Sequence, residues 1–359
     1  MTGSGGEDGP ARPPIALTPG EPAGICGELT LMAWREATAK HQRNADTVAD
    51  PLPGFFAIDD PRRLEALARR LGLSVPIRVI GSAADALPAF DHGLPVLPLE
   101  FPAPVKPGQP DPANAPAVLE AIERAVALVK SGEAAAIVTN PVHKHTLYSA
   151  GFRHPGHTEY LAELAGTSQP PVMMLACPAL RVVPVTVHQA LRQALDSLSA
   201  AAIVHAGRVT AAALAGDFGI ARPRLAVAGV NPHAGEDGAL GREEIEIIAP
   251  ALAELNAAGI DATGPAPPDT LFHPRAREGY DAALCMYHDQ ALIPLKTIDV
   301  EHGVNVTLGL PFVRTSPDHG TALRLAGQGT ASPASLIAAL ALAGRMADAR
   351  MATRQRAIA

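Results

Sequence analysis

The sequence predicts an α/β fold with much parallel sheet. Short β-branched or apolar runs alternate with longer helical patterns along most of the chain, and such runs are typical of strands buried on both faces. With 359 residues and an apolar content of 47%, the chain is also too long for one ordinary core. We therefore expect two domains or one large two-lobed unit.

Each expected strand is a short apolar run between helical patterns. In chain order these runs are Ile15–Thr18, Phe55–Ile58, Ile77–Ile80, Ala135–Thr139, Val172–Ala176, Val182–Val187, Leu225–Val230 and Ala282–Met286. A helix is predicted where Val118, Ile122, Val126 and Val129 share one face. A second helix is predicted over Arg242–Ala258, with a kink at Pro250.

The order of these elements suggests an interleaved pair of lobes. Residues 15–150 plus 300–359 are expected to form a first α/β lobe, and residues 151–299 a second one. Residues 1–14 are rich in Gly and Pro and acidic, without the pattern of a signal peptide, so we expect a disordered tail.

Composition excludes several classes of protein. The formal net charge is −7 with no long block of either sign, so nucleic acid is not expected as a partner. No run approaches the roughly 18 apolar residues of a membrane helix. Cys26, Cys177 and Cys285 are odd in number and widely spaced, which fits neither a disulfide framework nor a zinc finger and favours a reducing cytoplasm.

Three histidines follow the carboxyl ends of three predicted strands, where ligands bind in open α/β sheets. They are His188, His233 and His288. A single histidine is more often a loop or core residue, but three in one topological position indicate a site. Neutral imidazoles suit zinc and related divalent ions, and three protein ligands leave a coordination position open for a substrate.

Several segments could hold an anion. The Gly-rich stretch 233–241 opens a helix, although a plain turn before a Glu-rich helix explains it equally well. The segment 156–159 also precedes a helix, with Thr158 as the expected N-cap. Lys296, Asn305 and Arg314 recur at intervals of nine, as expected if they converge on one anionic ligand, while scattered surface charges are the alternative for each alone.

No Gly-x-Gly-x-x-Gly follows a predicted strand, because the segment Gly20–Gly27 has the wrong spacing. A Rossmann dinucleotide site is therefore not indicated. The residues by themselves point to a metal enzyme that acts on an anionic, phosphorylated small molecule, and they do not name the reaction.

Seven longer motifs resemble those of the 4-hydroxythreonine-4-phosphate dehydrogenase family of pyridoxal phosphate biosynthesis, and together they cover nearly everything after the tail. They are Leu17-Thr-Pro-Gly-Glu-Pro-Ala-Gly24, Thr139-Asn-Pro-Val-His-Lys144, Pro155-Gly-His-Thr-Glu159, Val230-Asn-Pro-His-Ala-Gly-Glu236, Pro268-Asp-Thr-Leu-Phe272, Met286-Tyr-His-Asp-Gln290 and Thr307-Leu-Gly-Leu-Pro-Phe-Val-Arg-Thr-Ser-Pro-Asp-His-Gly-Thr-Ala322.

The resemblance implies two α/β/α lobes with a cleft between them, as in the isocitrate and isopropylmalate dehydrogenases, which use NAD without the usual glycine fingerprint. It also implies a homodimer in which the partner chain completes the cleft. The metal ligands it implies are His188, His233 and His288 in the second lobe. The substrate contacts it implies are His157, Thr158, Lys296, Asn305 and Arg314.

The reaction implied is the oxidation of 4-phosphooxy-L-threonine by NAD or NADP to 2-amino-3-oxo-4-phosphooxybutanoate, which loses carbon dioxide to give 3-amino-2-oxopropyl phosphate. A divalent ion (zinc, cobalt, magnesium or manganese) would assist both steps. Lys144 and Asp269 stand in family motifs as candidates for proton transfer or for orienting other groups, and the base stays unassigned.

Two positions depart from the family pattern: Cys26 and Asn140 stand where many members have Gly. A relative that oxidises phosphorylated threonate or erythronate is therefore an alternative. A metal-dependent phosphate-ester hydrolase and a non-catalytic sensor of a phosphorylated metabolite are two further alternatives, although few carboxylate ligands for a two-metal site are evident.

Overall fold

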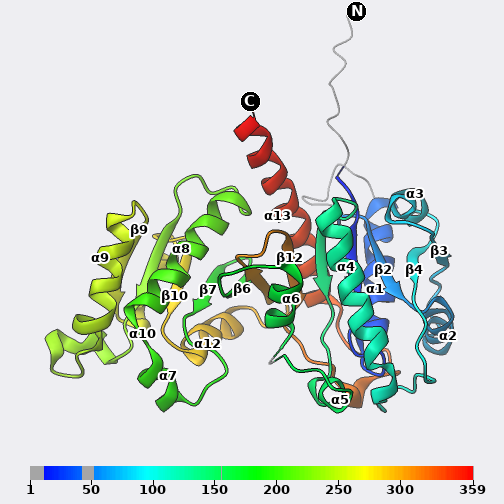
Figure 1. The fold of residues 1–359 in the computed structure, drawn as a ribbon, viewed down its shortest axis with the longest axis horizontal. Coiled ribbons are helices and arrows are strands. Elements are labelled where there is room, and N and C mark those ends of the chain that lie inside the picture. The colour runs from blue at the N-terminus through cyan, green and yellow to red at the C-terminus, as the bar shows by residue number, and fades with distance from the viewer. Residues whose placement is uncertain (1–11, 43–51, 155, 359) are drawn as a thin grey trace, which may run out of the picture.

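The computed structural model describes residues 12–42, 52–154 and 156–358. The predicted tail over residues 1–14 lies outside these residues except for its last three. Pro155, the first residue of the motif Pro155–Glu159, also lies outside them. Within the described chain, one mixed sheet of twelve strands runs through the whole molecule, with helices on both of its faces (Figure 1).

The strand order in this sheet is β3-β4-β2-β1-β5-β12-β11-β6-β7-β10-β8-β9. The strand bounds are β1 Ile15–Thr18, β2 Phe55–Asp59, β3 Ile77–Val79, β4 Leu94–Pro98, β5 Ala136–Thr139, β6 Val172–Cys177, β7 Leu180–Pro184, β8 Arg224–Ala228, β9 Asp261–Ala266, β10 Ala282–Cys285, β11 Val304–Leu308 and β12 Val313–Pro317.

Parallel strands form both ends of the sheet, and an antiparallel block joins them. The strands β3, β4, β2, β1, β5 and β12 are parallel to one another, and so are β7, β10, β8 and β9. β11 is antiparallel to both β12 and β6, and β6 is antiparallel to β7. The centre of the sheet is thus built partly from the end of the chain.

The helices cover the sheet from both sides. Their bounds are α1 Cys26–Gln42, α2 Pro61–Leu71, α3 Ala86–Phe90, α4 Ala115–Ser131, α5 Lys144–Ser149, α6 His157–Ala165, α7 Leu191–Ser197, α8 Ala200–Gly216, α9 Ala249–Ala257, α10 Pro268–Leu271, α11 Pro274–Arg277, α12 His288–Ile298 and α13 Ala334–Ile358, with short non-α helices η1 Ala83–Asp85, η2 Pro112–Asn114, η3 Pro232–Gly238, η4 Glu244–Ile248 and η5 Leu323–Leu325.

Three clusters of buried apolar side chains hold these layers together. The largest continues along one face of the sheet beneath α1, α8, α9 and α13. On the opposite face a second cluster lies under α4 and α6, and a third lies under α12. The long helix α13 contacts β5, β11 and β12, so it covers the antiparallel centre of the sheet (Figure 1).

All eight predicted strands are present, with ends that differ by a few residues, and the α/β class is confirmed. The predicted helix face around Val118 is buried in α4. Over the predicted helix Arg242–Ala258 the structure has one turn of π-helix, η4, which ends directly before α9 and leaves Pro250 in the first turn of α9; the kink at Pro250 stays a prediction. That position suits proline, because the first turn has no use for its missing N–H.

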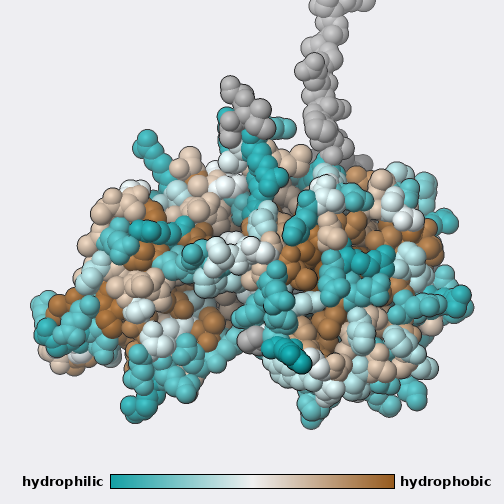
Figure 2. Space-filling view, viewed as in Figure 1, coloured by the Kyte–Doolittle hydropathy of each residue, from teal (hydrophilic) through white to brown (hydrophobic). Residues whose placement is uncertain are grey.

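No single helix in the described chain is long and apolar enough to cross a membrane. α7 and α8 pass that test only as a pair, and they are bent by 91° relative to each other. In the space-filling view the lower edge of the molecule is hollowed between α7 and α5, near the middle of the sheet (Figure 2).

Candidate active site

A buried arginine with no carboxylate partner among the described residues marks the centre of the sheet. Arg314 is the second residue of β12, and its neighbour Thr315 donates a hydrogen bond to a carbonyl of α13. Because side chains alternate along a strand, Arg314 points to the face away from α13. There its guanidinium donates to the Thr139 hydroxyl at 3.1 and 2.5 Å and to the Thr307 hydroxyl at 2.8 Å.

These partners are neutral, and burial lowers the pKa of Arg314 to about 10. The group still carries its charge at neutral pH. A buried cation with only hydroxyl partners lacks the opposite charge that normally compensates its desolvation. The site therefore favours an anionic ligand.

Arg314 opens into two adjoining cavities, of about 770 Å³ and about 240 Å³. Asn305 of β11 lines both of them, as do His157 and Lys144. Thr158 lines the larger one together with His188. Four of the five predicted substrate contacts therefore converge around one space, although they come from three separate segments of the chain.

The start of α6 forms one wall of the larger cavity. The predicted N-cap at Thr158 is wrong: α6 begins at His157, two residues earlier than predicted, with Gly156 in extended conformation as its N-cap. Thr158 is consequently a half-buried residue of the first helical turn. Because the first four N–H groups of a helix lack helical partners, the backbone here can still offer donors to an anion.

His157, at the first position of α6, is held neutral. Burial lowers its pKa to about 3, and the nearby cations Arg314 and Lys144 act in the same direction. Its Nε2 atom is buried without a hydrogen-bond partner among the described residues. An unsatisfied buried ring nitrogen beside an uncompensated guanidinium is expected where a polar ligand completes the bonds.

The fifth predicted contact, Lys296 of α12, lies beside the smaller cavity. Its ammonium forms an ion pair with Asp318 at 2.9 Å, and Asp318 lines that cavity together with His319. Lys296 therefore reaches the site through Asp318 in this structure and is not itself part of the wall.

The three candidate metal ligands follow three adjacent parallel strands. β10 lies between β7 and β8 in the sheet, so His188, His288 and His233 stand at one edge. The rings of His188 and His288 are 6.0 Å apart between centroids. His233 does not join them: no group of three or more His, Cys, Asp or Glu in the described chain is close enough to hold a metal ion.

The backbone at this edge is unusual. His188 and His233 have positive φ angles of 53° and 52°, which is rare for residues other than Gly and is characteristic of functional segments. The run around His233 is held by Glu244, whose buried carboxylate accepts hydrogen bonds from the N–H groups of Val230 and Asn231, both at 2.7 Å. This contact fixes the Gly-rich stretch whose role the sequence left open.

The two candidates for proton transfer are separated. Lys144 lines both cavities around Arg314, whereas Asp269 lines a different cavity beside α12 together with Asp289. Within one chain, Asp269 therefore lies at a different cavity from the predicted substrate contacts.

The two unusual residues near the first motif are both buried. Asn140 donates to the Thr18 carbonyl at 3.0 Å, and the Cys26 thiol contacts the Pro141 carbonyl at 3.6 Å. Burial raises the pKa of Cys26 to about 12, which makes a reactive thiolate unfavourable at neutral pH. Both side chains contact backbone carbonyls of the neighbouring loops, and neither lines the two cavities around Arg314.

Sequence reasoning missed Thr139 and Thr307, the hydroxyls that hold Arg314. Both stand in quoted family motifs, but a threonine in a strand is ordinary, because β-branched residues are common there. Only the strand order, which places β5, β12 and β11 side by side, assigns them to the arginine.

The chain resembles proteins of known name over most of its length. The model of the family described as "Pyridoxal phosphate biosynthetic protein PdxA" matches residues 53–343. A 4-hydroxythreonine-4-phosphate dehydrogenase of Bradyrhizobium diazoefficiens is 55% identical over 350 residues, which is 95% of this chain and 99% of the relative. The relative of that name from Methylorubrum populi is 54% identical over 341 residues, 93% of this chain and 95% of the relative.

A solved structure agrees with these matches. The crystal structure of 4-hydroxythreonine-4-phosphate dehydrogenase from Klebsiella pneumoniae superposes with a TM-score of 0.80 at 38% identity, covering 93% of this chain and 99% of that one.

The lowered pKa of His157 predicts a pH dependence of stability. Between pH 6.5 and about 3, the unfolded chain binds a proton on this ring and the folded chain does not. The free energy of unfolding should therefore fall as the pH drops through this window. The measurement is thermal unfolding of the ligand-free protein. Between pH 7 and pH 5, we expect the midpoint temperature of His157→Gln to fall by less than that of the parent protein.

The control for this measurement is His145→Gln, which changes an exposed histidine of the neighbouring helix α5. It should follow the parent closely. An equal pH slope for His157→Gln and the parent would show that this ring does not resist protonation in the folded state.

Proposed function

Since this chain belongs to the PdxA family of pyridoxal phosphate biosynthetic proteins, we propose that it is a 4-hydroxythreonine-4-phosphate dehydrogenase, the name its curated relatives carry. It oxidises the secondary hydroxyl of 4-phosphooxy-L-threonine with a nicotinamide cofactor, NAD or NADP. The product, 2-amino-3-oxo-4-phosphooxybutanoate, then loses carbon dioxide to give 3-amino-2-oxopropyl phosphate.

The observation that carries this proposal is the uncompensated Arg314. A phosphate ester supplies the negative charge that this guanidinium lacks, and its planar fork can bind two phosphate oxygens at once. The hydroxyls of Thr139 and Thr307 already fix the guanidinium, so little side-chain freedom is lost on binding. Asn305 and the start of α6 offer further donors around the same cavity.

The other residues of the cavity are assigned by what they can offer. His157 is neutral and donates or accepts a hydrogen bond without adding charge. In the oxidation, the hydroxyl of the substrate loses its proton and the adjacent carbon loses a hydride to the nicotinamide ring. Of the two sequence candidates, Lys144 is the one that lines this cavity, and we assign it to hold or move that proton.

The three histidines at the neighbouring strand ends have the donor chemistry that a divalent metal requires, although the described part of one chain does not bring all three together. His188 and His288 approach each other there, and burial, Lys144 and His288 lower the pKa of His188, which keeps its ring in the neutral form that binds metals. We propose His188, His233 and His288 as the ligands of zinc, cobalt, magnesium or manganese. Such an ion supplies Lewis acidity toward hydroxyl and carbonyl oxygens.

We further propose that the working unit is a homodimer with a shared cleft. His233 and Asp269 belong to the expected site but are not gathered with Arg314 in one chain. The second half of the molecule also exposes several large apolar side chains, as an interface would. These are Leu191, Leu195, Leu240, Ile245, Ile293, Ile298 and Val300. The three free, buried cysteines suit a cytoplasmic protein.

The activity and the role of Arg314 are tested together. Purified protein with a divalent metal and NAD should generate NADH absorbance with 4-phosphooxy-L-threonine, and more slowly with phosphorylated threonate or erythronate. Arg314→Ala should lower kcat/KM by roughly ten- to a hundredfold, because it removes charge-assisted hydrogen bonds of about 1.5–3 kcal/mol.

The control is the dephosphorylated substrate. On it the wild type and Arg314→Ala should differ much less, because the arginine then has little to bind. If Arg314→Ala lowers kcat/KM equally on both substrates, Arg314 does something other than bind the phosphate. Absence of NADH with all three phosphorylated substrates would contradict the dehydrogenase itself.

The metal proposal predicts that His233→Ala loses most of its bound metal while remaining folded, because two remaining imidazoles bind a divalent ion poorly. Metal content is measured by elemental analysis and folding by circular dichroism. The control is His92→Ala, which changes an exposed histidine between α3 and β4. This variant should keep its metal. Full activity of chelator-treated, metal-free enzyme would exclude this assignment.

The shared cleft predicts complementation between inactive variants. Arg314→Ala and His233→Ala change groups that would face each other across the interface, so mixing and exchanging subunits should restore NADH formation through heterodimers with one intact cleft. A mixture of Arg314→Ala and Asn305→Ala, which change the same cavity, should stay at the low activity of the separate variants. A monomer with full activity at the assay concentration would contradict the proposal.

A further inference from the structure

Buried side chains join the loops that lead from three adjacent strands to the candidate metal ligands. The strands β7, β10 and β8 end at Pro184, Cys285 and Ala228, and each histidine stands a few residues further along its loop. Past the end of a ladder, a buried backbone group needs another hydrogen-bond partner. Thr186 and Gln290 supply such partners here.

Thr186 joins the loop of His188 to the loop of His288. Its hydroxyl donates to the carbonyl of Met286 at 2.7 Å, and the residue is only 5% exposed. Met286 directly follows β10 and lies two residues before His288. Because Thr186 lies two residues before His188, this bond fixes the spacing of the two loops just ahead of their imidazoles.

Gln290 extends the link to the loop of His233. It lies in the first turn of α12 and is 6% exposed. Its Oε1 accepts from the N–H of Met286 at 2.6 Å, and its Nε2 donates to the carbonyl of Gly229 at 2.7 Å. Since a backbone N–H only donates and a carbonyl only accepts, both ends of the amide are matched. Gly229 directly follows β8, so one buried chain of hydrogen bonds crosses all three loops.

The loop of His233 also packs directly on Gly229. A Cβ atom at Gly229 would lie 3.0 Å from both the Cα and the Cβ of Ala234, and 3.1 Å from Oε1 of Glu244. Ala234 is the neighbour of His233, and Glu244 holds the backbone of the same loop. A displacement of Gly229 would therefore be passed on to His233, because close-packed groups transmit strain.

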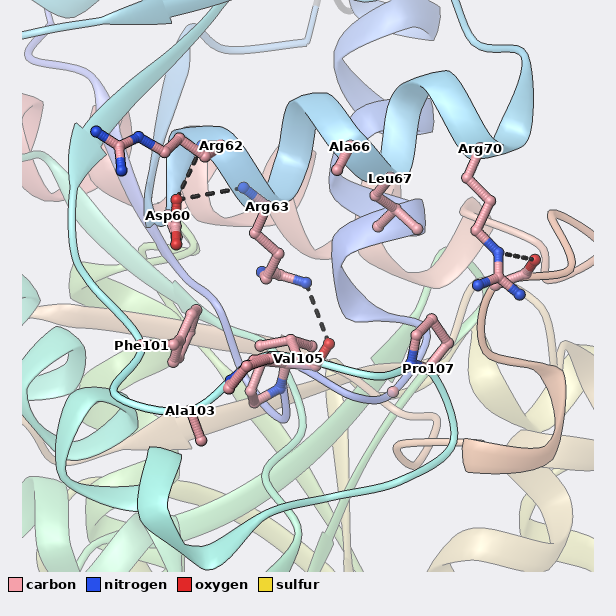
Figure 3. Close-up of a pocket in the computed structure, with 14 residues that line it drawn as sticks. Asp60, Arg62, Arg63, Ala66, Leu67, Arg70, Phe101, Ala103, Val105 and Pro107 are labelled. Carbon is pink, nitrogen blue, oxygen red and sulfur yellow. Dashed lines mark hydrogen bonds between the residues drawn. The ribbon is translucent and has the colours of Figure 1, made fainter.

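The first half of the sheet contains a link of the same kind. Arg63 of α2 binds the carboxylate of Asp59, at the end of β2, and donates at 3.1 Å to the carbonyl of Pro22 in the loop after β1 (Figure 3). In both halves, a side chain of the helix that follows one strand holds the loop after the neighbouring strand. The link through Gln290 is neutral, so it adds no charge beside the three histidines.

The backbone at two of the histidines requires such support. His188 and His233 have φ angles of 53° and 52°, and residues other than Gly keep such angles only where the surrounding structure over-determines them. In the proposed homodimer, His233 completes a cleft shared with the partner chain. Its own chain must therefore hold its loop in place.

We propose that Thr186 and Gln290 are positioning residues of the metal site. They hold the loops of His188, His233 and His288 at a fixed spacing through backbone hydrogen bonds. This inference rests on the metal ligands assigned under the proposed function. Groups that orient metal-binding histidines typically contribute about 10- to 100-fold to metal affinity.

The test measures metal binding and is independent of turnover. The intact protein is freed of metal with a chelator and titrated with Co²⁺, whose visible absorption reports the number and arrangement of its ligands. Thr186→Val and Gln290→Met should each raise the dissociation constant of Co²⁺ by about tenfold or more and alter its spectrum. Thr186→Ser keeps the hydroxyl and should stay within about twofold of the wild type.

A matched control separates positioning from stability. Asn256 also links two backbone segments through its amide: it donates to the carbonyls of Leu252 and Ala262 at 3.0 and 2.9 Å and accepts from the N–H of Ala262 at 3.2 Å. This link joins α9 to the start of β9, at the opposite end of the strands from the histidines. Asn256→Leu should lower the midpoint of thermal unfolding but bind Co²⁺ within about twofold of the wild type, with an unchanged spectrum.

The outcomes separate this inference from the function on which it rests. If Thr186→Val and Gln290→Met lose thermal stability but bind Co²⁺ with the affinity and spectrum of the wild type, both side chains only support the fold, and the proposed metal site stands. If Gln290→Met does not fold, Thr186→Val decides, because it removes a single hydroxyl. If the wild type itself binds no Co²⁺, the proposed metal site fails and this inference fails with it.

Discussion

The burial of one cation, with no opposite charge beside it in the described part of the chain, governs the centre of this molecule. Arg314 is 4% exposed and is held by two threonine hydroxyls. Desolvating a guanidinium is costly, and hydroxyl partners repay only part of that cost. The strands that supply these partners, β5, β11 and β12, must lie side by side. The antiparallel block at the centre of the sheet meets that requirement, and in the function we propose the phosphate of the substrate supplies the missing charge.

Much of the fold could be predicted because buried parallel strands are almost wholly apolar. Four strands, however, escaped sequence reasoning: β4, β9, β11 and β12. β4 and β9 contain prolines, which normally argue against a strand. In β11 and β12 the candidate site residues Asn305 and Arg314 interrupt the pattern, because they stand where an apolar residue would complete it. The strands that carry the site are thus the ones whose patterns the site disrupts.

The candidate site could be predicted only in part, for a related reason. Charged and imidazole side chains near strand ends are conspicuous, so Arg314 and the three strand-end histidines became candidates from residue type and position, whereas Lys144 became one only through the family resemblance. Thr139 and Thr307 resemble any strand threonine, and their contribution depends on partners up to 175 residues away. Asp269, in contrast, is conspicuous in sequence but lies beside another cavity. Distance along the chain says little about which side chains meet.

The interleaved strand order also determines when the cavity around Arg314 can form during synthesis. β12 pairs with β5, and β11 with β6, so two central strands come from residues 304–317, and α13, which covers them, follows. A nascent chain that has emerged only as far as β10 can pair β1, β2 and β5 but has two unfilled strand positions beside β5. Because such long-range pairing is slow and unpaired strand edges invite aggregation, the ribosome must release nearly the whole chain before this protein is protected from misassembly.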